Sequence, residues 1–151
     1  MALKIQDAGT LREITRLYIR QSGVNRRIRT LKVMDGGTLR TVAVFADPLS
    51  VTASGVSGTG TSSVVTTNTT TATPSGGFGP YTYVWTRISA GAADPSTATS
   101  SLSATTAFRK TGMAPGQFAQ DFWRVTVTDS IGSTATADIS ATFFYSTGGS
   151  S

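Results

Sequence analysis

The chain has 151 residues, of which 38% are hydrophobic and 14% charged, and its formal net charge is +5. It contains no Cys and no His, which excludes disulfides, thiolate metal sites and the commonest general base. No apolar run approaches the ~20 residues that span a bilayer, and the N-terminus lacks the apolar core of a signal peptide. We therefore expect no membrane insertion, and assembly in a cytoplasm.

A 14-residue repeat opens the chain, with glycine recurring at Gly9, Gly23 and Gly37. Apolar and polar residues alternate between the glycines, which is the pattern of half-buried strands, and the glycines fit tight turns. Residues 11–18 also fit helical spacing, but a glycine interrupts every repeat. We predict short strands joined by glycine turns.

The repeat brings a set of apolar residues and arginines into register, and these form the predicted docking or oligomerisation interface. A strand–turn–strand unit of this size cannot bury its apolar face alone, so it needs neighbours from its own chain or from others. We expect isolated residues 1–45 to be unfolded. The predicted interface residues are Leu3, Ile5, Arg12, Ile14, Leu17, Ile19, Arg26, Ile28, Leu31, Val33, Arg40 and Val42.

The arginines at the repeated position, Arg12, Arg26 and Arg40, allow three interpretations. They neutralise the phosphates of a nucleic acid, they pair with carboxylates of an acidic partner protein, or they form a solvated face beside a buried Leu/Ile face. A ladder of like charge is costly unless something acidic meets it, which motivates the interface with an acidic partner. Residues 46–151 add nothing to nucleic-acid binding, which counts against that interpretation.

Charge divides the chain near Pro48. Residues 1–45 hold nine Lys/Arg and three Asp/Glu, a net +6, whereas residues 46–151 hold four and five, a net −1. We therefore predict a basic β-repeat over 1–46, a second domain over 47–145 and a flexible tail over 146–151.

In the second domain, segments with the pattern of β-strands are separated by residues that favour turns. This spacing predicts an antiparallel β-sandwich of immunoglobulin type. Alternation places Tyr81, Tyr83 and Trp85 on one face of a strand and Trp123, Val125 and Val127 on one face of another. The glycine-rich segments 55–60 and 75–79 are predicted to be flexible loops without phosphate-binding character. The predicted strands are 49–54, 63–73, 81–88, 101–109, 120–128 and 133–145.

Catalytic chemistry is hard to assemble from this composition. The acids occur one at a time, Asp129 falls in a turn where Asp is favoured for backbone reasons, and Lys110 has no serine partner motif. We predict no enzyme activity, no cofactor and no metal. Phe78, Tyr81 and Phe118 fall in or beside loops and admit two interpretations, a sugar-binding platform at one end of the sandwich or a cap on its core.

Two resemblances accompany these patterns. The segments Gly79–Thr86, Thr106–Arg109, Trp123–Gly132 and Ala135–Ala141 resemble immunoglobulin-like domains of the PKD type, over about residues 48–145. The first part resembles a glycine-punctuated Arg-x-Ile repeat of bacteriophage tail and fibre-like proteins, although Leu11, Asn25 and Leu39 stand where an aromatic often precedes the arginine.

Together the resemblances imply a structural protein of a bacteriophage particle, located in the virion. We expect a tail-tip, fibre-adaptor or collar component, whose N-terminal repeat docks or oligomerises and whose immunoglobulin-like domain projects outward. The expected partners are other virion proteins, and the expected assembly is a homo-oligomer, for example a trimer. A capsid or tail-tube decoration protein and a module that binds a host-surface glycan are the alternatives.

Overall fold

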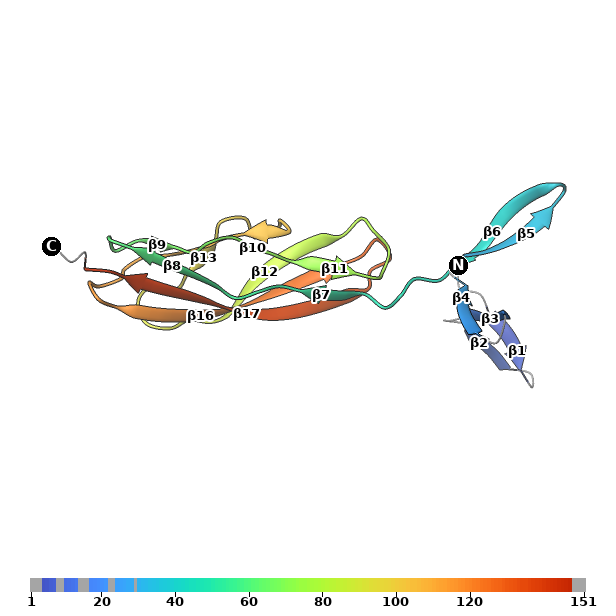
Figure 1. The fold of residues 1–151 in the computed structure, drawn as a ribbon, viewed down its shortest axis with the longest axis horizontal. Helices are drawn as coiled ribbons and strands as arrows, with labels where there is room; N and C mark the ends of the chain where they lie inside the picture. The colour runs from blue at the N-terminus through green and yellow to red at the C-terminus, as the bar shows by residue number, and fades with distance from the viewer. Residues whose placement is uncertain (1–3, 8–9, 14–16, 22–23, 29, 148–151) are drawn as a thin grey trace. The chain divides into compact units, whose positions relative to one another are not determined.

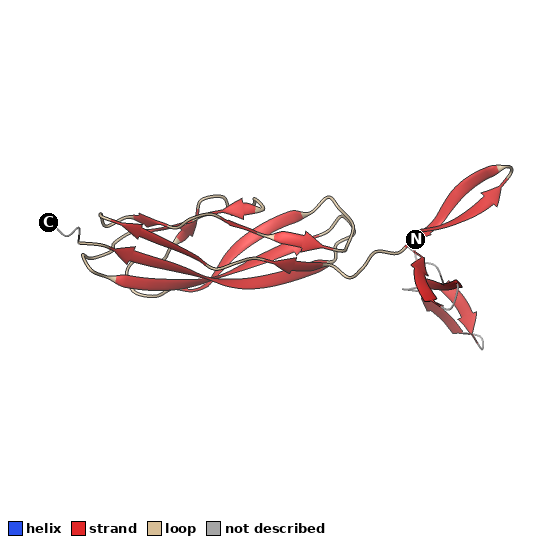
Figure 2. Cartoon of the chain, viewed as in Figure 1, coloured by secondary structure: helices blue, strands red, loops and turns tan. Residues whose placement is uncertain are grey.

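The structure, a computed structural model, describes residues 4–7, 10–13, 17–21, 24–28 and 30–147. The protein is all-β, and within these ranges only strands, turns and loops occur (Figures 1 and 2). The chain divides into two compact units, Met1–Asp47 and Pro48–Ser151. The division falls one residue after the boundary expected from the change in charge.

The first unit is built from three β-hairpins, each a separate two-stranded antiparallel sheet. The third hairpin turns through Gly36 and Gly37, whose φ values of 56° and 82° are those of a type I′ turn. Gly9 and Gly23 lie outside the described residues. The strands are β1 (Lys4–Asp7), β2 (Thr10–Glu13), β3 (Leu17–Gln21), β4 (Val24–Ile28), β5 (Thr30–Asp35) and β6 (Thr38–Val44).

The second unit is an immunoglobulin-like sandwich in two layers. One layer is a four-stranded sheet in the order β12 (Thr82–Ser89), β16 (Phe118–Thr128), β17 (Thr134–Tyr145) and β8 (Val56–Gly60). The other contains β13 (Thr97–Ala98), β15 (Phe108–Lys110) and β9 (Val65–Thr66), with the pairs β7 (Ser50–Thr52)–β11 (Thr73–Ser75) and β10 (Thr70–Thr71)–β14 (Thr105–Thr106).

Three aromatic side chains form the centre of the core between the layers. The Phe108 ring of β15 lies 5.7 Å from Trp85 of β12, edge to face, and 4.7 Å from Trp123 of β16. Trp85, Trp123, Val125 and Val127 are all buried, and both strand faces expected from alternation are confirmed.

The glycine-rich segment 55–60 is not a flexible loop, and the prediction was wrong there. Residues 56–60 form β8, which pairs in parallel with β17, from Val56 opposite Ala141 to Gly60 opposite Tyr145. Glycine is needed because a Cβ on Gly58 would overlap the Thr66 carbonyl oxygen of the neighbouring segment. This parallel pair is the exception to the antiparallel sandwich among the described strands.

We expect Gly58→Ala to lower the free energy of unfolding of the sandwich by about 1–3 kcal/mol, because the new methyl group meets backbone that must shift. Thr59→Ala, at an exposed position on the same strand, is the control and should stay within about 0.5 kcal/mol. Urea denaturation measures both, and equal effects would contradict the close approach.

Candidate interaction surfaces

The three hairpins share one register around the repeated arginine. Cα pairing sets Ile5 opposite Arg12, Ile19 opposite Arg26, and Val33 opposite Arg40. Directly opposed residues of an antiparallel pair lie on the same face of the sheet. Arginine and the β-branched residue of each repeat therefore belong to one face, and the 14-residue period is a period of whole hairpins.

The third hairpin exposes apolar side chains on both faces. Met34 and Leu39 are cross-strand partners with 62% and 60% of their surface exposed, and Val33 on the other face is 49% exposed beside Arg40. The solvated-face interpretation of the arginines requires basic and apolar residues to be segregated, and this hairpin does not segregate them. Such a hairpin needs contacts with other segments or chains, because an isolated two-stranded hairpin is marginally stable at best.

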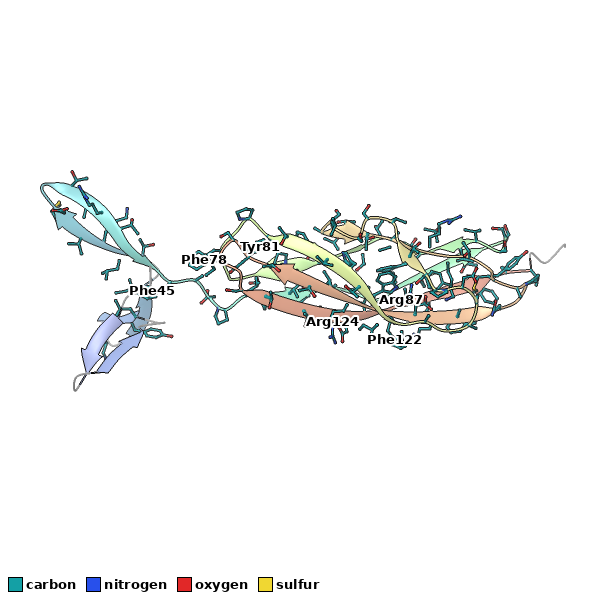
Figure 3. The ribbon with its side chains drawn as sticks, turned by 180° about the vertical axis from the view of Figure 1, so that it is seen from behind. Phe45, Phe78, Tyr81, Arg87, Phe122 and Arg124 are labelled. Atoms are coloured by element: carbon teal, nitrogen blue, oxygen red, sulfur yellow. The ribbon has the colours of Figure 1, made fainter. Side chains whose placement is uncertain are left out.

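For the remaining predicted interface residues, the structure describes the side chain in some cases and only the backbone in others. Leu17, Ile28 and Leu31 are half-buried. Leu3 and Ile14 lie outside the described residues, and for Ile5, Arg12, Ile19, Arg26 and Val42 the structure describes the backbone alone. Phe45, which follows β6 and carried no prediction, is buried (Figure 3).

The three aromatics of the predicted sugar platform do not meet. Phe78 and Tyr81 lie together at the end of the sandwich near Asp129, half-buried, and the Tyr81 hydroxyl donates to the Gly76 carbonyl at 2.6 Å (Figure 3). Phe118 begins β16, whereas the partner of Thr82 is Thr128 at the other end of that strand, roughly 30 Å away. Phe78 and Tyr81 cap one end of the sandwich, and Phe118 is 62% exposed at the other.

Phe118 belongs instead to an aromatic group on the outer face of the four-stranded sheet. Phe144 is its cross-strand partner on β17, and Phe122 follows four residues along β16. These three phenylalanines are 62%, 39% and 44% exposed in the order Phe118, Phe144, Phe122. Alternation along 118–128 was sufficient to predict this group, since the even-numbered positions face opposite to Trp123 and Val125.

A buried ion pair links the two layers of the sandwich. Lys110 Nζ of β15 lies 2.8 Å from Asp121 Oδ1 of β16, and both side chains are fully buried. Asp121 also accepts from the Gly91 and Ser96 amides at 2.8 Å each, and the Lys110 Nζ lies 5.6 Å from the centre of the Phe143 ring. Neither residue was predicted to have a partner, although alternation with buried Phe108 puts Lys110 on the inner face.

The surroundings of Asp121 keep it ionised. Burial by itself would raise the pKa of Asp121, but hydrogen bonds from Lys110, Ser96 and the Gly91 amide outweigh it and leave the pKa below its ordinary value. The pair therefore acts as a structural cross-link in which a carboxylate is matched by one cation and two amides.

Asp129 organises the turn between β16 and β17. Its carboxylate accepts from the amides of Phe78 at 3.1 Å, Ile131 at 3.0 Å and Ser133 at 2.8 Å. Desolvation opposes ionisation, but these amides prevail and lower the pKa of Asp129. The backbone role expected for this residue is confirmed.

Acidification is expected to destabilise the sandwich. The pKa values of Asp121, Asp129 and Asp138 are all lowered on folding, the last by Arg124, which holds it through two hydrogen bonds of 2.6 and 2.7 Å. Their contribution is present above the unfolded pKa of about 4 and is lost as pH falls through the lower folded values.

Thermal melts should therefore show a Tm that is nearly constant from pH 5 to pH 8, because the chain has no His, and that drops below about pH 4. Asp129→Asn should lower the Tm at neutral pH and flatten the acid decline. A Tm that rises between pH 5 and pH 3 would contradict the assignment.

The described residues hold neither a candidate metal site nor a helix that could cross a membrane. No group of three or more His, Cys, Asp or Glu side chains within them is placed to hold a metal ion. No helix suited to crossing a bilayer was found in the same part of the chain.

The fold and these surfaces define an all-β protein, in which a repeat of hairpins precedes an immunoglobulin-like domain. No protein-family model matches the chain, and comparison with curated proteins gives no match. A conjugative transposon lipoprotein from Bacteroides eggerthii matches in structure with a TM-score of 0.35 and 12% identity. The match covers 62% of this chain and 96% of the lipoprotein's chain.

Proposed function

We propose that this chain is a structural protein of a bacteriophage particle, a component of the tail tip, fibre adaptor or collar. The first unit docks or oligomerises, and the immunoglobulin-like domain is the module it attaches. The observation that carries the proposal is the set of separate two-stranded hairpins with apolar side chains exposed on both faces of the third. The resemblance of the repeat to phage tail proteins supplies the setting.

Strand edges support the same conclusion. Among the described strands, each hairpin pairs only with itself, so no other described strand meets its outer backbone N–H and C=O groups. Open edges beside exposed apolar residues are the usual starting point for pairing with another chain. A symmetric homo-oligomer, for example a trimer, or insertion against a virion protein supplies the missing strands and apolar contacts.

Sedimentation of the full-length chain tests the docking role. The wild type is expected to self-associate. The double variant Met34→Thr, Leu39→Thr should weaken association by at least tenfold, because both side chains are more than half exposed in the single chain and their apolar contacts with the second copy are removed. Leu102→Thr, which alters a side chain 73% exposed in the other unit, is the matched control. Equal association of all three chains would overturn the oligomerisation role.

Copy number in the native particle distinguishes a tail component from a capsid or tail-tube decoration protein. A few copies related by symmetry indicate a tail appendage, and hundreds of copies indicate capsid or tail-tube decoration. Mass-resolved stoichiometry of the purified assembly makes this measurement. A chain absent from the particle would overturn the structural role altogether.

Glycan binding at a host surface is a second candidate, favoured by the group of Phe118, Phe122 and Phe144. Phenylalanine rings on a sheet face that also carries Gln120 and Thr142 offer stacking surface with polar groups between. Binding of the full-length chain to a glycan array, lost in Phe122→Ser and kept in Val84→Ser, would support it.

A further inference from the structure

Basic charge is concentrated in the middle repeat. Between Ile14 and Met34 the sequence contains no Asp or Glu. The second hairpin, Leu17–Ile28, lies inside this stretch, and its described side chains include exposed Tyr18, at 53%, and exposed Arg20. The cations of the stretch are Arg16, Arg20, Arg26, Arg27, Arg29 and Lys32.

The hairpin register shows how the repeats differ. In the third hairpin Asp35, diagonal to Arg40, forms an ion pair with it at 3.3 Å between Oδ2 and Nε. In the first hairpin Asp7 occupies the same register position relative to Arg12. In the second hairpin that position is Gln21, diagonal to Arg26. The acid that two repeats carry beside their arginine is thus replaced by a neutral amide in the middle one.

Because of this difference, the register of the middle hairpin supplies no carboxylate diagonal to its arginine, whereas the registers of the first and third hairpins do. The guanidinium group presents a planar fork of donors that matches carboxylate geometry, and five of the six cations in this stretch are arginine. The same hairpin carries apolar residues. Leu17 and Ile28 are half-buried, and Tyr18 is exposed and lies opposite Arg27 in the register. The hairpin combines arginine with partly covered apolar surface.

We propose that the second hairpin, Leu17–Ile28, is the docking site for a carboxylate-rich surface of a partner protein. This inference rests on the proposed docking function and names the chemistry of its partner. Charge complementarity favours an acidic partner, because a second copy of this stretch would bring six further cations and no Asp or Glu. The apolar residues in the same register favour a protein over a nucleic acid, whose interfaces are more polar and positively charged throughout.

The test restores the acid of the repeat. Gln21→Asp places in the middle hairpin the residue type that the first and third hairpins already carry, so the hairpin should fold unchanged. Gln21→Asn controls for side-chain size, and Asn68→Asp, at an exposed position in the other unit, controls for net charge. Binding of each full-length chain to poly-L-glutamate and to a DNA duplex is measured in one buffer by fluorescence anisotropy.

Gln21→Asp should weaken binding to poly-L-glutamate about threefold, whereas the two controls stay near the wild type. Equal weakening by Gln21→Asp and Asn68→Asp would overturn the site, and so would the absence of binding to poly-L-glutamate. Tighter binding of the wild type to duplex DNA than to poly-L-glutamate would assign the hairpin to nucleic acid instead. Sedimentation with the Met34 and Leu39 variants tests the proposed function on other residues, so the two proposals fail independently.

Discussion

Replacing Lys110 alone by methionine is expected to lower the free energy of unfolding of the sandwich by about 3–5 kcal/mol. The substitution leaves the Asp121 carboxylate fully buried with two amide donors and no cation. An unmatched buried charge is costly because the interior cannot solvate it. Urea denaturation near pH 7 measures the loss, with Arg109→Met, at the exposed neighbouring position on β15, as the control.

A second substitution separates charge from packing. In the background of Lys110→Met, Asp121→Asn removes the stranded charge and should recover part of the lost stability, so the double variant is more stable than Lys110→Met alone. The recovery should fade at low pH, where Asp121 is protonated in the single variant. A loss below about 1 kcal/mol for Lys110→Met, similar to that of Arg109→Met, would refute the cross-link.

Phe108→Ala is expected to destabilise the sandwich by about 3–5 kcal/mol. Phe108 is fully buried and contacts both tryptophans of the chain, so its removal opens a cavity between the two layers. Tryptophan fluorescence reports on this site alone, because Trp85 and Trp123 both line it. Both the fluorescence emission of the folded variant and its midpoint in urea should differ from those of the wild type.

Leu102→Ala is the matched control for the core substitution. Its side chain is 73% exposed, so the change should stay within about 0.5 kcal/mol and leave the emission unchanged. If Phe108→Ala and Leu102→Ala behave alike, the aromatic centre does not hold the layers together.

Local patterns along the chain predicted the hairpins and the strand faces correctly. Turn chemistry at Gly36 and Gly37 acts over a few residues, and alternation acts within one strand, so Trp85 and Trp123 were assigned to the inner face without knowledge of their neighbours. The neutral residue at Gln21 was not predicted, although register positions can be compared from sequence once the hairpin period is known.

Other features depend on partners that are distant in the chain. The segment 55–60 resembled a loop because glycine weakens strands, and it becomes β8 only since β17 lies beside it, with the Thr142 hydroxyl donating to the Val56 carbonyl across 86 residues. Likewise Phe78 and Tyr81 were grouped with Phe118 by residue type, whereas the length of β16 separates them.

The sequence by itself determined the all-β class, the hairpin period and the concentration of basic charge, because each depends on residue type and spacing over a single turn or strand. Only the tertiary structure decided which layers meet, that Lys110 and Asp121 neutralise each other in the core, and that the third hairpin exposes apolar side chains on both faces. Burial and pairing are properties of the packed chain, since they depend on which distant segment excludes water from a given side chain.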